Sequence, residues 1–267
     1  MKKQVVFGLA AVFSLVASAA GVESSNTFGV MKVDAGEATE KRDVFISVPW
    51  IEVGNSDSDQ TVNATNLVLA SQLDEGDMLF VYGGGSTTGK FGAWAVANSA
   101  GVKYWASVTV SAPDETYIPG TKAGLNRGNG IVVQTAQRYI YLYGQYSSTA
   151  NVLSIAPGDE SRSYTLIGTQ FAKDYDLNNG DQVVWAGTID PGDYIITELG
   201  VEYTRTSTNT WQKWTGRYNT ITTWGNTQSQ MKIYTDEGVT IPQGRGAWYA
   251  RKGTGPLTIQ FLDYVEE

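Results

Sequence analysis

Four aromatic side chains gather in a stretch of the C-terminal half that is rich in Thr and Asn and poor in aliphatic residues. They are Trp211, Trp214, Tyr218 and Trp224. Flat rings stack on sugar faces, and burying roughly 100 Å² of a ring contributes about 2–3 kcal/mol. Trp211 and Trp214 are separated by two residues, so in a regular strand they point to opposite faces. We expect one of the two to be core. Core or subunit packing is the favoured interpretation of the four aromatics, and a glycan-binding surface is the alternative.

Five acidic residues are the candidates for a glycosidase-type pair of carboxylates: Asp77, Asp181, Asp193, Glu198 and Glu202. Such a pair needs two different environments, one for the acid and one for the base or nucleophile. Asp77 and Asp181 each follow a Leu-x-x-Gly turn, which favours a structural role. The chain has no His and no Cys, which excludes a Ser-His-Asp triad, a Cys-His dyad and the usual zinc sites. We therefore expect a protein that is not an enzyme.

Oxygen-bearing side chains alternate in two short loops, as they do in calcium-binding loops. The first loop has Asn55, Asp57 and Asp59, and the second has Asp174, Asp176 and Asn178. A helix-loop-helix calcium site requires Gly at the sixth position of the loop, where these loops have Gln60 and Asn179. Solvated turn residues are the favoured interpretation, calcium is the weaker alternative, and no other cofactor is expected.

The overall charge is acidic. The formal net charge is −8 and the isoelectric point is about 4.7. An acidic surface repels phosphate backbones, so a nucleic-acid partner is not expected.

The N-terminus has the pattern of a cleaved export signal. Lys2 and Lys3 precede an apolar run over Val5–Val16, and Ala17-Ser18-Ala19 supplies the small residues of a cleavage site. The run is too short to cross a bilayer, which takes about 20 residues, and no later segment is long and apolar enough to span. We expect a mature chain outside the cytoplasm of a bacterium, either secreted, at the cell surface or in the periplasm.

Short strand-like runs separated by Gly, Asn, Asp and Pro recur along the mature chain. Examples are Val44–Val48, Met78–Tyr82 and Ile131–Thr135. This spacing is typical of a sandwich or barrel. Little helix is expected, beyond one short turn near Ala35–Lys41. The predicted fold class is all-β.

The two halves resemble each other at four points in the same order. Leu73-x-x-Gly76-Asp77 matches Leu177-x-x-Gly180-Asp181, Gly101-Val102 matches Gly200-Val201, Leu125-x-x-Gly128-x-Gly130 matches Ile241-x-x-Gly244-x-Gly246, and Tyr139–Tyr143 matches Leu257–Phe261. These matches predict an internal duplication that gives two related sandwich-like or barrel-like units. By analogy with the second half, Tyr139, Tyr141 and Tyr143 are expected to face the core.

The expected boundaries follow from these patterns. They are a signal peptide at 1–19, an N-terminal segment at 20–43, a first β unit at 44–146, a linker at 147–163 and a second β unit at 164–267.

Two stretches carry a resemblance to a known group of proteins. One is Tyr164-Thr165-Leu166-Ile167-Gly168 followed by Leu177-x-x-Gly180-Asp181, and the other is the mature start at Ser25–Val33 followed by Val48-Pro49-Trp50. Together with Gly244-x-Gly246-Ala247-Trp248-Tyr249, they resemble exported bacterial proteins with tandem β-rich repeats. The group has no established activity, so the resemblance implies export and repeats but no functional residues.

Three functions remain from the sequence. The favoured one is an exported structural or surface protein that is not an enzyme and associates with itself. The second is a glycan-binding module that uses exposed Trp and Tyr side chains on surface glycans. A carboxylate-based glycosidase is the third.

Overall fold

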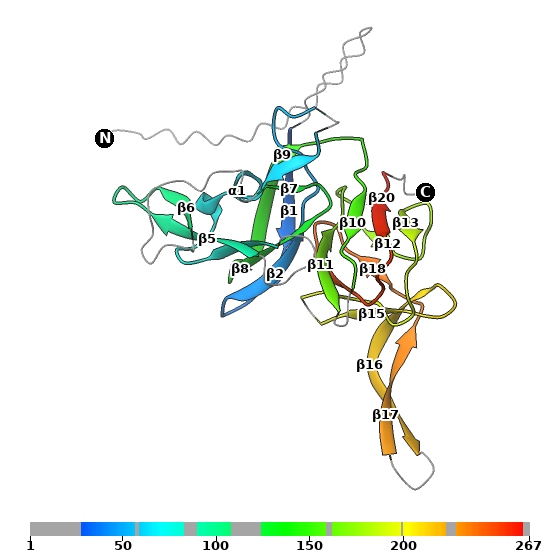
Figure 1. Cartoon of the computed structure of the whole chain (residues 1–267). Helices are drawn as coiled ribbons and strands as arrows, with labels where there is room; N and C mark the ends of the chain where they lie inside the picture. The colour runs from blue at the N-terminus through cyan, green and yellow to red at the C-terminus, as the bar shows by residue number, and fades with distance from the viewer. Residues whose placement is uncertain are drawn as a thin grey trace.

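The computed structural model describes residues 28–56, 59–82, 90–107, 124–158, 162–198, 200–222 and 228–263. Within them the chain is all-β, as predicted, and every strand pair is antiparallel (Figure 1). The expected signal peptide lies outside these residues. In the part of the chain that is described, no helix is long and apolar enough to cross a membrane.

The first unit runs from β1 to β9. Its main sheet has the order β2-β8-β4-β5-β6, formed by Arg42–Ser47, Gly130–Thr135, Met78–Tyr82, Lys90–Ala97 and Lys103–Ser107. Two short pairs complete it: β1 (Phe28–Asp34) with β9 (Tyr139–Gln145), and β3 (Thr61–Asn63) with β7 (Gly124–Asn126). Between β3 and β4 lie the one-turn helix α1 (Ala64–Leu67) and the 3₁₀ turn η1 (Ala70–Gln72).

The second unit runs from β10 to β20. Its main sheet has the order β11-β19-β14-β15-β16-β17, formed by Ser163–Gly168, Gly246–Arg251, Tyr194–Ile196, Glu202–Arg205, Trp211–Thr222 and Gln228–Thr235. A three-stranded sheet joins β10 (Leu153–Ile155), β20 (Leu257–Phe261) and β13 (Val183–Gly187), and β12 (Tyr175–Asp176) pairs with β18 (Thr240–Ile241).

The two units repeat one pairing scheme. The order β2-β8-β4-β5-β6 recurs as β11-β19-β14-β15-β16, the pair β1-β9 recurs as β10-β20, and the pair β3-β7 recurs as β12-β18. The differences are local. The second unit has β13 where the first has α1 and η1, and β17, which lies beyond β16, has no counterpart among the described residues of the first unit. Each unit has its own apolar core.

Three segments differ from their sequence-based interpretation. β1 lies in the expected N-terminal segment yet pairs with β9 of the first unit, and β10 lies in the expected linker yet pairs with β20 of the second. Ala35–Lys41 forms no helical turn. The helical turn is at α1 instead, where the Asn63 side chain accepts the Thr65 N–H at 3.1 Å and caps the helix N-terminus.

The sequence match between Asp77 and Asp181 is wrong, because the structural partner of Asp77 is Asp193. Both lie just before the third strand of their main sheet, and both are fully buried. Each carboxylate accepts the N–H of the residue three positions earlier, Asp74 at 3.0 Å and Asp190 at 3.4 Å. Asp181 lies instead before β13, where its N–H donates to the Asn179 side chain at 2.9 Å.

The tyrosine stripe of β9 does not face the core. Ile140 and Leu142 are fully buried, whereas Tyr139, Tyr141 and Tyr143 are only partly buried. In β20 the buried residues are Leu257, Ile259 and Phe261, as expected. The analogy failed because the two strands correspond with a shift of one residue, which exchanges the faces of a strand.

The two units meet through reciprocal backbone contacts. The Ser47 N–H donates to the Gly244 carbonyl of the second unit at 3.0 Å, and the Gly168 N–H donates to the Gly128 carbonyl of the first at 2.8 Å. Ser47 and Gly168 are the corresponding last residues of β2 and β11. A small apolar cluster lies beside this joint: Phe80, Val132 and Leu166, with Phe45, Met78, Tyr82 and Trp248 packed against it.

Close approach at the joint requires Gly168. A Cβ at this position would lie 2.5 Å from Ser47 Cα. We expect Gly168→Ala to lower the free energy of unfolding by about 1–3 kcal/mol, the typical cost of overpacking. Chemical denaturation of a protein that comprises residues 20–267 measures this free energy. Gly180→Ala is the control, because a Cβ there meets nothing within 4 Å. Equal effects of the two substitutions would contradict this account of the joint.

Candidate functional site on the arm formed by β16 and β17

β16 and β17 form a long hairpin that leaves the second unit, and we call it the arm. In Figure 1 it extends, in gold and orange, away from both units. β17 is the last strand of its sheet, so one edge of it is unpaired within the described residues. In the described first unit no strand corresponds to β17. Among the described residues, the arm is therefore the main feature of the second unit without a counterpart in the first.

The root of the arm is fixed by Trp211, which is fully buried. Its ring centroid lies 5.5 Å from that of Trp185 and 5.8 Å from that of Tyr249. The Asn178 side chain brackets its backbone, donating to the Trp211 carbonyl at 2.9 Å and accepting the Trp211 N–H at 2.8 Å. Trp211 is thus a core residue, which fulfils the expectation that one of the two tryptophans is core.

A bulge turns the arm out of its sheet. The β16–β17 register shifts between Trp214 and Tyr218. Gly216 has φ of +77° there, a conformation that favours glycine, and Thr215 Oγ1 donates to the Ile233 carbonyl at 2.9 Å. Bulges bend a strand and increase its twist, so this one separates the buried root from the exposed outer part.

The outer part presents an aromatic pair. The rings of Trp214 and Tyr218 meet edge to face with centroids 5.5 Å apart, and Lys232 Nζ lies 4.8 Å from the Trp214 ring centroid. Trp214 is partly buried and Tyr218 is exposed. Trp224 lies outside the described residues. The structure therefore brings together two of the four predicted aromatics, on the arm.

Glu202 of β15 holds the arm to the unit, a role that sequence reasoning missed. Its carboxylate pairs with Lys232 Nζ at 2.5 Å and accepts the Tyr234 hydroxyl at 2.9 Å. Burial, and then the hydrogen bond to Glu202, raise the pKa of Tyr234 to about 12. The sequence does place a Glu on the strand next to the hairpin. Its contacts with Lys232 and Tyr234 could be predicted only once the register of the hairpin was known.

Removing the Glu202 carboxylate charge should lower the Tyr234 pKa. In Glu202→Gln we expect a value closer to 10 but still above it, because burial is the larger cause. A raised tyrosine pKa stabilises the fold below pH 10, and this stabilisation is lost as the pH rises from 10 to about 12. NMR titration of ring-labelled tyrosine measures it, with Tyr234→Phe to assign the signal. An unchanged pKa in Glu202→Gln would contradict the contact.

The other predicted carboxylates have separate structural partners. Thr135 Oγ1 donates to Asp77 at 2.6 Å, and the Tyr249 hydroxyl donates to Asp193 at 3.0 Å. Glu198 forms an ion pair with Arg245, and burial raises the pKa of Glu198. These contacts stabilise turns and the joint, and they do not assemble a pair of opposed carboxylates.

The residues of the two predicted calcium loops bond to the chain itself. Asp59 Oδ1 accepts the Thr61 hydroxyl at 2.6 Å, Asp174 Oδ1 accepts the Gln243 N–H at 2.6 Å, and Asp176 Oδ1 accepts the Asn178 N–H at 2.9 Å. Asn55 donates to the Thr61 carbonyl at 3.1 Å, and Asp57 lies outside the described residues. Among the described residues, no three acidic side chains gather as a metal site would require.

Comparison with protein-family models, with curated proteins and with solved structures finds no match to this chain. What the protein does must therefore be argued from its own geometry.

Proposed function

We propose that this is an exported structural or surface protein, not an enzyme, that associates with itself through the arm. The proposal rests on one observation: the second unit carries an exposed ribbon, and no described residue pairs with the outer edge of β17. The sequence supports the remaining parts: the pattern of the first nineteen residues favours export, and the absence of His and Cys removes the common catalytic groups.

The arm has little stability of its own unless another surface packs on it. A two-stranded ribbon without a packing partner is at best marginally stable in water. Residues 215–220 of β16 are all exposed, and Met231 on β17 is 55% exposed. An unpaired edge strand is also a template for pairing with another chain. A second copy that packs on the arm would cover these side chains and satisfy the edge.

Shortening the arm tests self-association. Replacing residues 219–231 by Asn-Gly keeps the root, the bulge and the Glu202 contacts, and joins the strands by a tight turn. We expect the parent mature protein to sediment as a concentration-dependent oligomer and the shortened protein to be a monomer. Analytical ultracentrifugation measures this, with circular dichroism to verify the fold.

A point substitution gives a matched control. Met231→Asp should weaken association by about tenfold or more, whereas Val152→Asp, at a similarly exposed residue just before β10, should not. Met231 is 55% exposed and Val152 is 53% exposed. A parent protein that stays monomeric at all concentrations, or equal effects of the two substitutions, would refute self-association through the arm.

Glycan binding is the second candidate, favoured by the Trp214–Tyr218 pair. An exposed Tyr218 ring beside a partly buried Trp214 ring on a polar strand is suited to stacking on sugars. A glycan array of the mature protein tests this, with Tyr218→Ala as the variant and Val152→Ala as the control. Retained binding in Tyr218→Ala, or no binding by the parent, would dismiss this candidate.

A further inference from the structure

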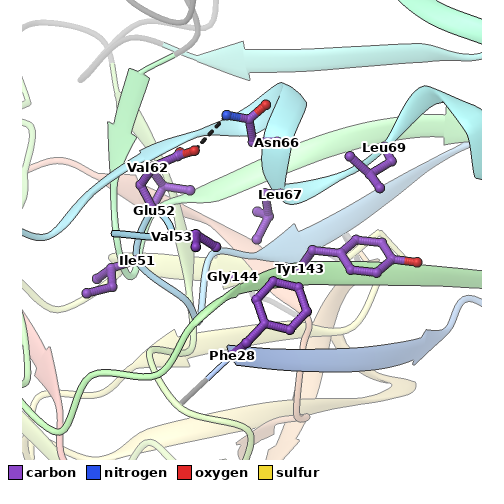
Figure 2. A pocket seen from close by; sticks show the side chains of 10 residues that line it. All are labelled: Phe28, Ile51, Glu52, Val53, Val62, Asn66, Leu67, Leu69, Tyr143 and Gly144. Atoms are coloured by element: carbon purple, nitrogen blue, oxygen red, sulfur yellow. Dashed lines mark hydrogen bonds between the residues drawn. The ribbon is translucent and has the colours of Figure 1, made fainter. Parts of the chain in front are cut away.

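A pocket of about 310 Å³ opens on the first unit between β9 and α1. Its walls are mainly apolar, with Phe28, Val53, Val62, Leu67, Leu69 and Tyr143. Figure 2 shows the rings of Phe28 and Tyr143 on one side, and Leu67 and Leu69 of the α1 segment facing them. The pocket is thus an apolar slot along the edge of a strand.

The backbone of β9 is satisfied on both sides of this slot. Gln145 exchanges two hydrogen bonds with Ile51, both at 3.0 Å. The Tyr141 N–H donates to the Gln72 side-chain oxygen at 2.7 Å, and the Gln72 amide donates back to the Tyr141 carbonyl at 2.9 Å. Gln72 therefore imitates the backbone of a neighbouring strand.

Tyr143 lies between these two positions. Alternate residues of a strand direct N–H and C=O to the same edge, so the Tyr143 backbone faces the slot as Tyr141 and Gln145 do. Among the described residues, none pairs with the Tyr143 backbone on this edge. One backbone donor and one acceptor therefore face an apolar pocket.

In the second unit, a strand covers the position that corresponds to the open backbone of Tyr143. The Leu262 N–H donates to the Gln182 carbonyl at 2.9 Å, as the Gln145 N–H does to Ile51. Gln145 thus corresponds to Leu262, and Tyr143 corresponds to Gln260. Val184 of β13 lies opposite Gln260 in the ladder. In the second unit an extended residue with an apolar side chain occupies the place that is open in the first.

The charged group in the wall of the pocket is already bonded within the protein, so it does not favour a charged ligand. Glu52 is the one charged side chain among the described residues that line it. Its Oε1 accepts the Asn66 amide at 2.6 Å and its Oε2 accepts the Asn63 N–H at 2.8 Å. Recognition must then come from the apolar walls and from the Tyr143 backbone.

We propose that this pocket binds an extended apolar segment of a partner polypeptide. The central residue of the segment pairs with the Tyr143 backbone through two hydrogen bonds, in the manner of strand addition. Its side chain lies on the Tyr143 side of the sheet, next to Phe28. The site is separate from the arm and does not depend on the proposed self-association.

A peptide with the sequence of residues 182–186, Gln-Val-Val-Trp-Ala, is the probe. Labelled and capped at both ends, it is titrated with the mature protein by fluorescence anisotropy, and we expect saturable binding. N-methylation of its second valine, the counterpart of Val184, removes the N–H that pairs with the Tyr143 carbonyl. Affinity should fall by about tenfold or more. N-methylation of the tryptophan, whose N–H points away, should change little.

Protein variants locate the site. Leu69→Glu and Val53→Glu each place a charge in the slot and should weaken binding by about tenfold or more. Val102→Glu is the matched control, because Val53 is 59% exposed in a turn and Val102 is 60% exposed in the loop before β6. Thermal unfolding verifies that each variant is folded. No saturable binding by the parent, equal losses with the two N-methylated peptides, or full binding by both Leu69→Glu and Val53→Glu would overturn the proposal.

Discussion

Replacing Trp211 by alanine is expected to lower the free energy of unfolding by about 3–5 kcal/mol, the usual cost of truncating a fully buried tryptophan. The indole fills the space between Trp185 and Tyr249, and Arg205 lies 5.5 Å from its ring centroid. Its loss leaves a cavity at the point where the arm joins the unit. Urea denaturation of a protein that comprises residues 20–267, monitored by tryptophan fluorescence, measures the change.

Trp214→Ala is the control, since Trp214 is only partly buried and lies beyond the root. We expect Trp214→Ala to lower the free energy of unfolding by about 1 kcal/mol or less. Trp211→Phe should fall between the two, because the smaller ring keeps part of the packing. Similar costs for Trp211→Ala and Trp214→Ala would show that the root is not a packed core.

Arg127→Met is also expected to have a large effect, and it should lower the free energy of unfolding by about 3 kcal/mol or more. Arg127 is fully buried at the joint. Its guanidinium donates to the Pro49 carbonyl of the first unit at 2.8 Å, to the Gln170 carbonyl of the second at 2.8 Å, and to the Thr149 carbonyl between them at 2.7 Å. Methionine fills a similar volume but leaves the Pro49 and Gln170 carbonyls, whose bonds to Arg127 are buried, without this donor.

Calorimetry distinguishes this prediction from a general loss of stability. Because Arg127 bonds to both units, its removal should separate the unfolding of the two units into two transitions. Arg138→Met is the control, since Arg138 is exposed and its ion pairs with Asp34 and Glu37 are at the surface, where such pairs contribute about 0–1 kcal/mol. A single unchanged transition in Arg127→Met would rule out this residue as the link.

The sequence predicts the strand-rich fold well because the relevant signals are local. Alternating apolar residues and Gly-rich turns occur within a few positions of each other, and most predicted runs are strands. The spacing of Trp211 and Trp214 likewise depends only on the two-residue period of a strand, so their different burial could be read directly.

The correspondence between the halves was harder to predict, because turn motifs recur. Leu177-x-x-Gly180-Asp181 repeats the leucine of the first-half motif, whereas Ile189-Asp190-x-Gly192-Asp193 repeats its first aspartate, and Asp193 is the residue that occupies the structural place of Asp77. The spacing gives a further signal. The same number of residues separates Gly76 from Gly192 as separates Gly128 from Gly244.

The arm and the pocket were not predictable for a different reason. Each depends on pairing between distant segments. Glu202 contacts Lys232 only because the hairpin folds back, and the Gln72 side chain reaches Tyr141 only because α1 replaces a strand. Residue types alone give no indication of such contacts.

The reciprocal contacts at the joint have a consequence for the assembly of several chains. Since β2 and β11 make the same bond to opposite partners, the contact is isologous, like that of a symmetric dimer. The first half of one molecule fits the second half of another as well as it fits its own. An exchange of halves between two molecules would keep these two backbone bonds, and the high local concentration imposed by the covalent linker favours the unswapped monomer.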